Sequence, residues 1–471
     1  PEESSLGNAA PSSINDTEED PKNIREGEFT KGKVSSHLIR LGSFMAMGSL
    51  TMNVAQLAEA IYLGIVGTEA LAAMGFAFPL TILLFAFAGG IGTGSSSVIA
   101  RTAGAGNKDR AAYLVTHAEL LAIIIGVLLG LVGYAVAPQV ITTLGATGIV
   151  RDMTIDYLRV YMIGVPFFML SIVGSTVLRA TGSAASPGIV MTAGSVLQII
   201  IGPILIFGWF GLPELGIAGA AWAYVISRIL SCVLYAWLLI RANMVRWTLT
   251  GAIKSWTAIL HVGGPAIASG LVMPFSMMLV TKLLAGHGHE VVAGFNVASR
   301  VETMAHMILW SVSSSAEPFV GQNWGAAKYQ RVKSALKMCH VFCLVWGVFT
   351  FLLMQMFGTA IASLIDDNET VVAVAYWFFL YIPLSIGFMG MTQVASSSFN
   401  ALGKPAPPFV ISLLRTIIVY VPLVYAGDYF WGYQGIFLAT AVTNVGVGLL
   451  AWRWNNNYIT HKTRSLESQT P

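Results

Sequence analysis

Residues 113–136 read YLVTHAELLAIIIGVLLGLVGYAV, an apolar run that contains a single acid. An α-helix rises about 1.5 Å per residue, so roughly 20 such residues cross the ~30 Å hydrocarbon core of a bilayer. Runs of this kind recur along the chain, and we count twelve. They are residues 40–66, 76–100, 113–136, 157–178, 188–210, 216–240, 256–284, 295–320, 333–358, 371–398, 408–427 and 433–453. The pattern therefore predicts an all-α membrane protein with twelve transmembrane helices.

The composition agrees with this fold class. Of the 471 residues, 55% are hydrophobic and 10% are charged, against about 25% charged residues in soluble domains. A soluble enzyme and a disordered scaffold are therefore disfavoured. The net charge of +3 is too small to indicate nucleic acid as a partner. The three cysteines lie inside apolar runs without the spacing of a metal site, and we expect neither a metal nor a cofactor.

Basic and acidic residues alternate between successive connections. Lysines and arginines concentrate near the N-terminus, in 101–110, 241–254 and 328–337, and near the C-terminus. The intervening connections carry mainly acids, among them Glu69, Glu214 and Glu290. Because cytoplasmic loops carry the excess of basic residues, we expect both termini in the cytoplasm. The membrane would be the inner membrane of a bacterium.

The two halves of the chain share landmarks at a constant offset of 221 residues. The matched pairs include Gly67 with Gly288, Gly104 with Gly325, Arg110 with Arg331 and Pro187 with Pro408. Such a shift spans six helices and keeps their orientation, so it predicts two pseudo-symmetric six-helix bundles, an arrangement found in transporters. The expected divisions are a disordered cytoplasmic tail at 1–37, an N-lobe at 38–240, a cytoplasmic linker at 241–255, a C-lobe at 256–455 and a cytoplasmic tail at 456–471.

Glu59 is an acid within the first apolar run. Ionisable groups in hydrocarbon cost at least ~2.5–3.5 kcal/mol, so each needs a structural or functional reason. Gln56 and Tyr62 lie three residues to either side, on nearly the same helix face. Burial favours the neutral form of a carboxyl group, so Glu59 could bind and release a proton or a sodium ion. A structural acid bonded to a neighbouring helix is the alternative.

Other residues of the runs are candidates for gating and for substrate contacts. Glu119 and Glu317 lie near the predicted cytoplasmic ends of their runs, where either a gating or a purely structural contact fits. Methionines and aromatic residues could line a pocket for bulky apolar cations, although a core or lipid-facing role is the alternative. The candidates for such a cleft are Asn53, Met273, Met277, Glu302 and Trp310.

Several motifs together resemble the multidrug and toxic compound extrusion (MATE) family across residues 38–455. They are EAIYLGIVGTEALAA at 59–73, AGAGN at 103–107, LRATGS at 178–183, GIAGAA at 216–221, VGQNWGA at 320–326 and NALGKP at 400–405. The resemblance implies a twelve-helix, two-lobe antiporter that expels organic compounds in exchange for protons or sodium ions.

Within the family the chain looks most like the DinF-like branch. That branch usually has an Asp in helix 1, and Glu59 takes this place eight residues before Gly67. A second Asp of the branch, in helix 5, is absent because Gly202 stands there. The resemblance then implies a coupling site with one carboxylate and neutral helpers. The helpers would be Gln56, Tyr62, Gln198 (for the branch's Asn) and Tyr224 (for its Thr).

These features predict a proton-coupled exporter of amphipathic or cationic organic compounds that works by alternating access and is not an enzyme. A lone glutamate suits a proton better than Na⁺, which prefers several oxygen ligands; a sodium-coupled exporter is one alternative. A flippase for a lipid-linked precursor is another. A membrane prenyl transferase is a third, and Asp366-Asp367 is the only acidic pair that it could use. We expect a monomer whose partners are small organic molecules, H⁺ or Na⁺, and the bilayer.

Overall fold

The computed structural model describes residues 28–365 and 368–467, and long helices account for most of them. The first half comprises η1 (Glu28–Thr30), α1 (Val34–Val66), α2 (Thr68–Gly104), α3 (Lys108–Thr143), α4 (Gly148–Ala180), α5 (Ser186–Phe207), η2 (Trp209–Gly211) and α6 (Gly216–Arg241). The second half comprises α7 (Ala252–Ala285), α8 (His289–Gly325), α9 (Tyr329–Ile365), α10 (Glu369–Ala401), α11 (Ala406–Leu413), the π-helix η3 (Leu414–Ile418) and α12 (Tyr420–Glu467).

The predicted twelve crossings are confirmed. Ten helical segments of the described chain are long and apolar enough to span a membrane, and the segment Ala406–Leu466 is one of them. That segment makes two crossings, because Gly432 has φ 60° and ψ −146° and reverses the chain. Gly427 and Gly435 then lie backbone against backbone in the resulting hairpin. The remaining crossing is α8, whose polar residues lower its hydropathy although it is 37 residues long.

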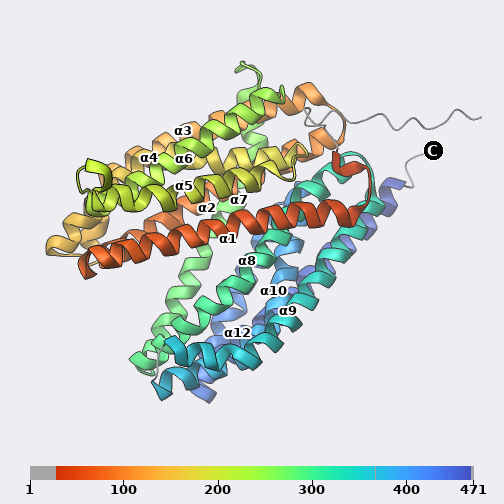
Figure 1. Cartoon of the computed structure of the whole chain (residues 1–471). Helices are drawn as coiled ribbons and strands as arrows, with labels where there is room; N and C mark the ends of the chain where they lie inside the picture. Colours follow the sequence, from red (N-terminus) through yellow and green to blue (C-terminus); the bar gives the residue numbers. More distant parts are fainter. Residues whose placement is uncertain (1–27, 366–367, 468–471) are drawn as a thin grey trace, which may run out of the picture.

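Each half forms its own bundle, as the repeat predicts (Figure 1). In the N-lobe, α4 packs against α2, α3 and α6, and α5 packs against α1 and α6. In the C-lobe, α10 packs against α8, α9 and α12. The two large buried apolar clusters follow nearly the same division, although Ile259 of α7 joins the first and Leu41 of α1 joins the second. Figure 1 shows the bundles close together at one end and diverging toward the other.

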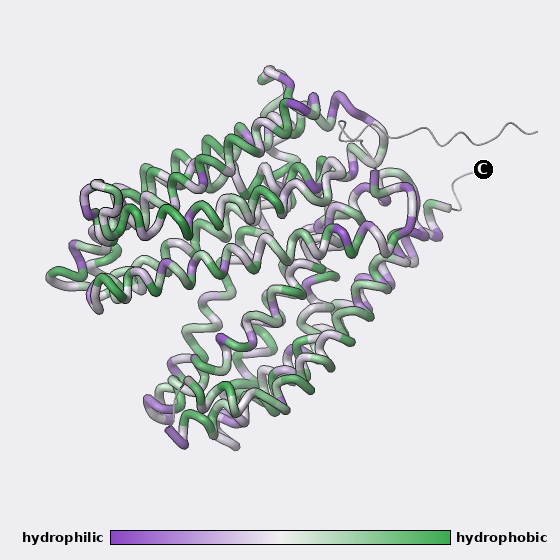
Figure 2. The backbone as a smooth tube through the Cα atoms, in the orientation of Figure 1, coloured by the Kyte–Doolittle hydropathy of each residue, from purple (hydrophilic) through white to green (hydrophobic). Residues whose placement is uncertain are grey.

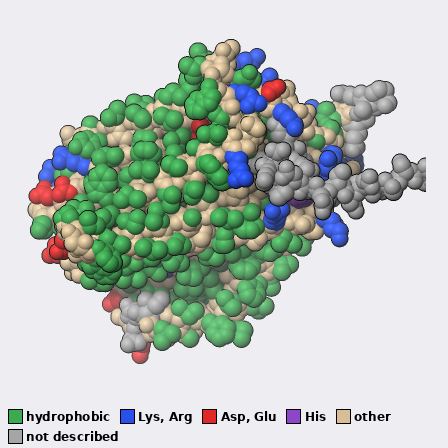
Figure 3. Space-filling model, turned by 45° about the horizontal axis from the view of Figure 1, so that its top comes forward, with side chains coloured by type: hydrophobic (Ala, Val, Ile, Leu, Met, Phe, Trp, Pro, Cys, Tyr) green, Lys and Arg blue, Asp and Glu red, His purple; other side chains and the backbone are tan. Residues whose placement is uncertain are grey.

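Lys and Arg side chains gather at the end where the bundles meet, which we call the basic end. It contains the start of α1, the α2–α3 and α8–α9 connections and the end of α12. Both ends of the described chain lie there (Figure 1). Apolar residues occupy the middle of the helices (Figure 2), and most visible acidic side chains lie at the opposite end (Figure 3). This is the charge distribution expected of a membrane-spanning protein.

The lobes touch at the basic end through glycine backbones. A Cβ built at Gly104 of α2 would lie 2.0 Å from the Gln322 carbonyl oxygen of α8. One at Gly325 of α8 would lie 2.1 Å from the Arg101 carbonyl oxygen of α2. The Arg101 guanidinium also donates to the Ala401 carbonyl oxygen at 2.7 Å. The pseudo-symmetric glycines of the repeat therefore close the lobes against each other.

The ordered chain extends beyond the predicted lobe boundaries. Residues 28–37 were expected in the disordered tail, yet the side chain of Phe29 is 0% exposed and stacks on Phe319. Asn323 and Arg331 donate to the Phe29 carbonyl oxygen at 3.2 and 2.8 Å. One aromatic anchor thus orders a polar segment. Likewise α12 continues to Glu467 through most of the predicted C-terminal tail. The rest of both tails and Asp366-Asp367 lie outside the described residues.

Candidate functional site

Glu59 lies on α1 and faces α4 and α5. The Tyr157 hydroxyl of α4 donates to Oε1 at 2.9 Å, and the Gln198 amide of α5 donates to Oε2 at 3.1 Å. In the described part of the chain, no Lys or Arg forms a salt bridge with this carboxyl group. Each carboxyl oxygen therefore has a neutral donor, and the group as a whole has no counter-ion. A carboxyl group in this setting is well placed to change its ionisation.

A small cavity borders the Glu59 carboxyl group. Its volume is about 10 Å³, and its lining includes Tyr62, Gln198 and Gly202. This is room for about one water molecule. A Cβ built at Gly202 would lie 3.2 Å from the Tyr62 ring, and the Tyr62 hydroxyl donates to the Ile199 carbonyl oxygen at 3.2 Å. The glycine that replaces the expected helix 5 Asp therefore leaves space for Tyr62 to cover the site.

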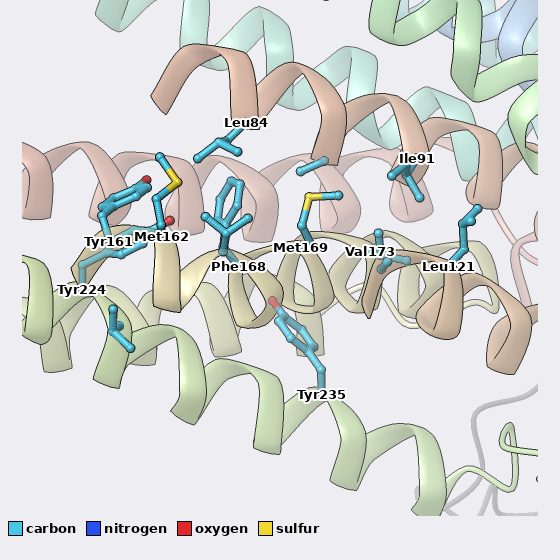
Figure 4. Close-up of a cluster of buried hydrophobic side chains, with 14 of the residues drawn as sticks. Leu84, Ile91, Leu121, Tyr161, Met162, Phe168, Met169, Val173, Tyr224 and Tyr235 are labelled. Atoms are coloured by element: carbon cyan, nitrogen blue, oxygen red, sulfur yellow. The ribbon is translucent and has the colours of Figure 1, made fainter. Parts of the chain in front are cut away.

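Three stacked tyrosines form the side of the site opposite Tyr62. The Tyr161 ring centroid lies 5.8 Å from that of Tyr157 and 4.4 Å from that of Tyr224. Figure 4 shows the Tyr161 and Tyr224 rings lying close together in the core of the N-lobe. Tyr157 is not among the residues predicted from the sequence. The spacing of Tyr157 and Tyr161, one helical turn apart in an apolar run, is the signal that could have indicated it.

The structure brings only some of the predicted coupling residues together. Gln198 contacts Glu59 directly, and Tyr62 borders the same cavity. Tyr224 lies one layer further away, behind Tyr161. Gln56 is exposed and makes no hydrogen bond with Glu59 within the described chain. Residues three apart on a helix differ by about 60° in direction, which is enough to turn Gln56 away from the site.

The C-lobe contains a much larger cavity of about 670 Å³, bounded by α7, α8, α10, η3 and α12. This volume lies in the range of ~300–1,000 Å³ typical of small-molecule sites. Four of the predicted cleft residues line it, namely Met273, Met277, Glu302 and Trp310. Asn53 instead lies on α1, where its amide donates to the Ser49 carbonyl oxygen at 2.9 Å. We call this space the C-lobe cavity.

Charged groups of both signs line the C-lobe cavity. The Glu302 carboxylate lies 2.9 Å from the imidazole of His306, one turn later on α8. Arg415 lies in η3, a π-helix of the kind often found at functional sites. Its guanidinium, which has five N–H donors, donates to Asn444 at 3.4 Å and to the Met389 sulfur at 3.2 Å. No acid of the described residues forms a salt bridge with it, although Glu302 lines the same cavity and is near enough to interact with it electrostatically.

The two predicted gating acids occupy different surroundings. Glu317 of α8 faces Ser96 of α2 and Arg179 of α4, where the lobes join. Glu119 lies inside the N-lobe beside Gly174 of α4. Glu317 is thus positioned for a contact between lobes, and Glu119 is not. Among the residues that the structure describes, no three His, Cys, Asp or Glu side chains come close enough to hold a metal ion.

Comparison with known proteins identifies the family of the chain. The MatE family model matches residues 45–204 and 265–426, one segment in each lobe. An FAD transporter of Shewanella oneidensis is 30% identical over 86% of this chain and 91% of its own length. The probable multidrug resistance protein YoeA of Bacillus subtilis is 27% identical over 82% of this chain and 87% of its own length.

A solved structure shows the same architecture. The crystal structure of the Vibrio cholerae MATE transporter VcmN in the bent form has a TM-score of 0.86 and 28% identity. The match covers 92% of this chain and 98% of that one. The two lobes, the twelve crossings and the family match lead to one conclusion: the chain belongs to the MatE family of membrane transporters.

Proposed function

We propose that the protein exports amphipathic organic compounds in exchange for protons, with Glu59 as the group that carries the proton. The observation that supports this most strongly is the Glu59 carboxyl group itself. It is enclosed by neutral donors, has no counter-ion in the described chain, and borders a space for about one water molecule. Glu59 is half-buried, and a carboxyl group that is partly shielded from bulk water and free of salt bridges can alternate between charged and neutral forms at low cost.

The side chains around Glu59 favour a proton over Na⁺ as the coupling ion. Both near neighbours, Tyr157 and Gln198, direct hydrogen-bond donors toward the carboxylate. Hard cations instead require several oxygen ligands, and Gly202 removes the second carboxylate that the DinF-like branch would supply. We therefore propose that the coupling ion is a proton and that the chain belongs to the DinF-like branch.

The arrangement of the lobes supports alternating access. They are closed at the basic end and diverge at the other (Figure 1). If the basic end is cytoplasmic, as the Lys and Arg distribution favours, the helices of the two lobes diverge toward the outside, as an outward-facing conformation requires. A proton arriving from outside would neutralise Glu59, the N-lobe helices would rearrange, and substrate would leave. We propose that the chain works as a monomer in the bacterial inner membrane with both termini in the cytoplasm.

Transport by the purified protein in proteoliposomes tests the coupling ion. Export of a fluorescent organic cation is followed with either a pH gradient or a sodium gradient, each at zero membrane potential. We expect the pH gradient alone to drive transport. Movement driven by sodium at clamped pH would contradict the proton assignment and support the sodium-coupled alternative.

A second candidate function is export of a phosphorylated aromatic compound. A relative named as an FAD transporter is 30% identical to this chain, and FAD carries a diphosphate between two aromatic systems. Arg415 lines the C-lobe cavity and forms no salt bridge with the described residues, and guanidinium groups bind phosphate well. Arg415 is the only Lys or Arg lining this cavity in the described chain, so the diphosphate of such a compound, or of a lipid-linked precursor, would have one guanidinium partner there.

Arg415→Gln distinguishes the two substrate classes. If FAD is a substrate, the variant is expected to export FAD roughly tenfold or more slowly, because one charge-assisted hydrogen bond contributes about 1.5–3 kcal/mol. Export of an organic cation would be unchanged or faster. The measurement is efflux of each compound from proteoliposomes, with the exposed Lys404→Gln as the matched control. Unchanged FAD efflux in Arg415→Gln would remove the support for this candidate.

A further inference from the structure

A groove on the outer flank of the N-lobe contains an acid that the coupling mechanism does not use. It has a volume of about 620 Å³, and its lining comes from α3, α4, α6 and the linker between the lobes. Ile240, Trp247 and Leu249 on its rim are 55%, 89% and 69% exposed, so the groove opens toward the lipid. Figure 3 shows that apolar side chains dominate the exposed flank of the molecule. We call this space the α3–α6 groove.

Glu119 lines the α3–α6 groove without a partner. Its Oε1 atom is buried and has no hydrogen bond, and within the described chain it forms no salt bridge. A Cβ built at Gly174 of α4 would lie 3.3 Å from this oxygen, so the glycine provides the room that the carboxyl group occupies. Buried polar atoms in native proteins nearly always have partners. An unpaired carboxyl group beside an open groove therefore indicates a ligand that donates hydrogen bonds.

The linker closes the α3–α6 groove at the basic end. His117 contacts the Thr248 carbonyl oxygen at 3.1 Å, and the Arg246 backbone N–H donates to the Thr116 hydroxyl at 2.8 Å. The Arg246 side chain is directed to Asp109, 3.2 Å away. The Arg246 guanidinium is therefore engaged with another acid. Trp247, in contrast, lines the groove and presents an aromatic ring to it.

We propose that the α3–α6 groove binds an amphipathic organic ammonium ion from the surrounding membrane leaflet, with Glu119 as its anionic partner. The ammonium group would donate to the carboxylate, and its apolar body would lie against residues such as Ile123 and Leu170. A nearby aromatic ring favours a cation further. A phospholipid fits less well, because the lining contains no Lys, Arg or His to pair with its phosphate.

Binding to the full-length protein in lipid nanodiscs tests the proposal. The probes are 12-bromododecylammonium, 12-bromododecyl sulfate and 12-bromododecanol, whose bromine quenches nearby tryptophans. The Trp247→Phe variant isolates the contribution of the tryptophan at the groove. We expect the ammonium probe to quench Trp247 at a mole fraction in lipid at least tenfold lower than the other two. Glu119→Gln should remove this difference, while Glu214→Gln, in the loop before α6, should keep it.

A second variant tests the location even if Glu119→Gln folds poorly. Ala236 lines the groove and is exposed, so Ala236→Phe fills the space without disturbing the core and without adding a tryptophan to the quenching signal. Loss of ammonium quenching in this variant supports the groove as the binding site. Equal quenching by all three probes in the wild type would overturn the proposal. So would wild-type ammonium binding in a folded Glu119→Gln variant or in Ala236→Phe.

Discussion

Glu59→Gln is expected to reduce export to the level of vesicles without protein, while expression and folding remain normal. The amide keeps the size of the side chain and can accept from Tyr157, so the free energy of unfolding should change by about 1 kcal/mol or less. It cannot bind and release a proton, and no second acid is available because Gly202 replaces the expected Asp. The measurement is export driven by a pH gradient, with folding checked by gel filtration and thermal unfolding.

Two control variants separate the carboxyl group from the general effect of a mutation. Glu59→Asp keeps an ionisable group and should retain measurable export. Glu69→Gln removes an exposed acid in the first turn of α2 and should behave as the wild type. Normal export by Glu59→Gln would remove Glu59 from the coupling mechanism.

Gly325→Ala is expected to shift the lobes away from the conformation closed at the basic end. The new methyl group would lie 2.1 Å from the Arg101 carbonyl oxygen and 2.8 Å from the carbonyl carbon, so the two backbones must separate. Overpacking of this kind costs about 1–3 kcal/mol, which corresponds to a change of roughly 5–150-fold in the ratio of two conformations. Export should fall because the outward-open form becomes rare.

Spin labels can measure this change directly. Lys108 and Lys404 are exposed at the basic end of opposite lobes, and Cys substitutions there allow their separation to be recorded by pulsed electron resonance. We expect a longer distance in Gly325→Ala than in the wild type. Gly446→Ala is the matched control, because a Cβ at Gly446 meets no atom within 4 Å. An unchanged distance in Gly325→Ala would show that this crossing does not hold the lobes together.

The fold was predictable because hydrocarbon thickness and the repeat constrain it strongly. The apolar runs gave the crossings, and the constant offset gave the two lobes. The limits of the ordered chain were harder to predict, because Phe29 is ordered by a contact with Phe319, which is far away in the sequence. The break between the predicted runs 408–427 and 433–453, by contrast, was visible in the sequence, and Gly432 reverses the chain there.

The coupling site was predictable only in part. Glu59 was identifiable because a charge in hydrocarbon is costly whatever its neighbours. The hydrogen-bond partners of Glu59 depend on which helices pack against α1, and this cannot be read from the sequence. Tyr157 was therefore missed, and Gln56 was included although it turns away from the site. The role of Arg415 depends on the local π-helix that directs it into the C-lobe cavity.

Substrate-driven proton movement tests the central claim, that Glu59 exchanges a proton for substrate, most directly. Proteoliposomes are prepared with equal pH on both sides and zero membrane potential, and substrate is added to one side while a trapped dye reports the internal pH. In the wild type, we expect the internal pH to change as protons move opposite to the substrate; Glu59→Gln should give no change. Substrate movement without a pH change in the wild type, or an equal change in Glu59→Gln, would contradict the account.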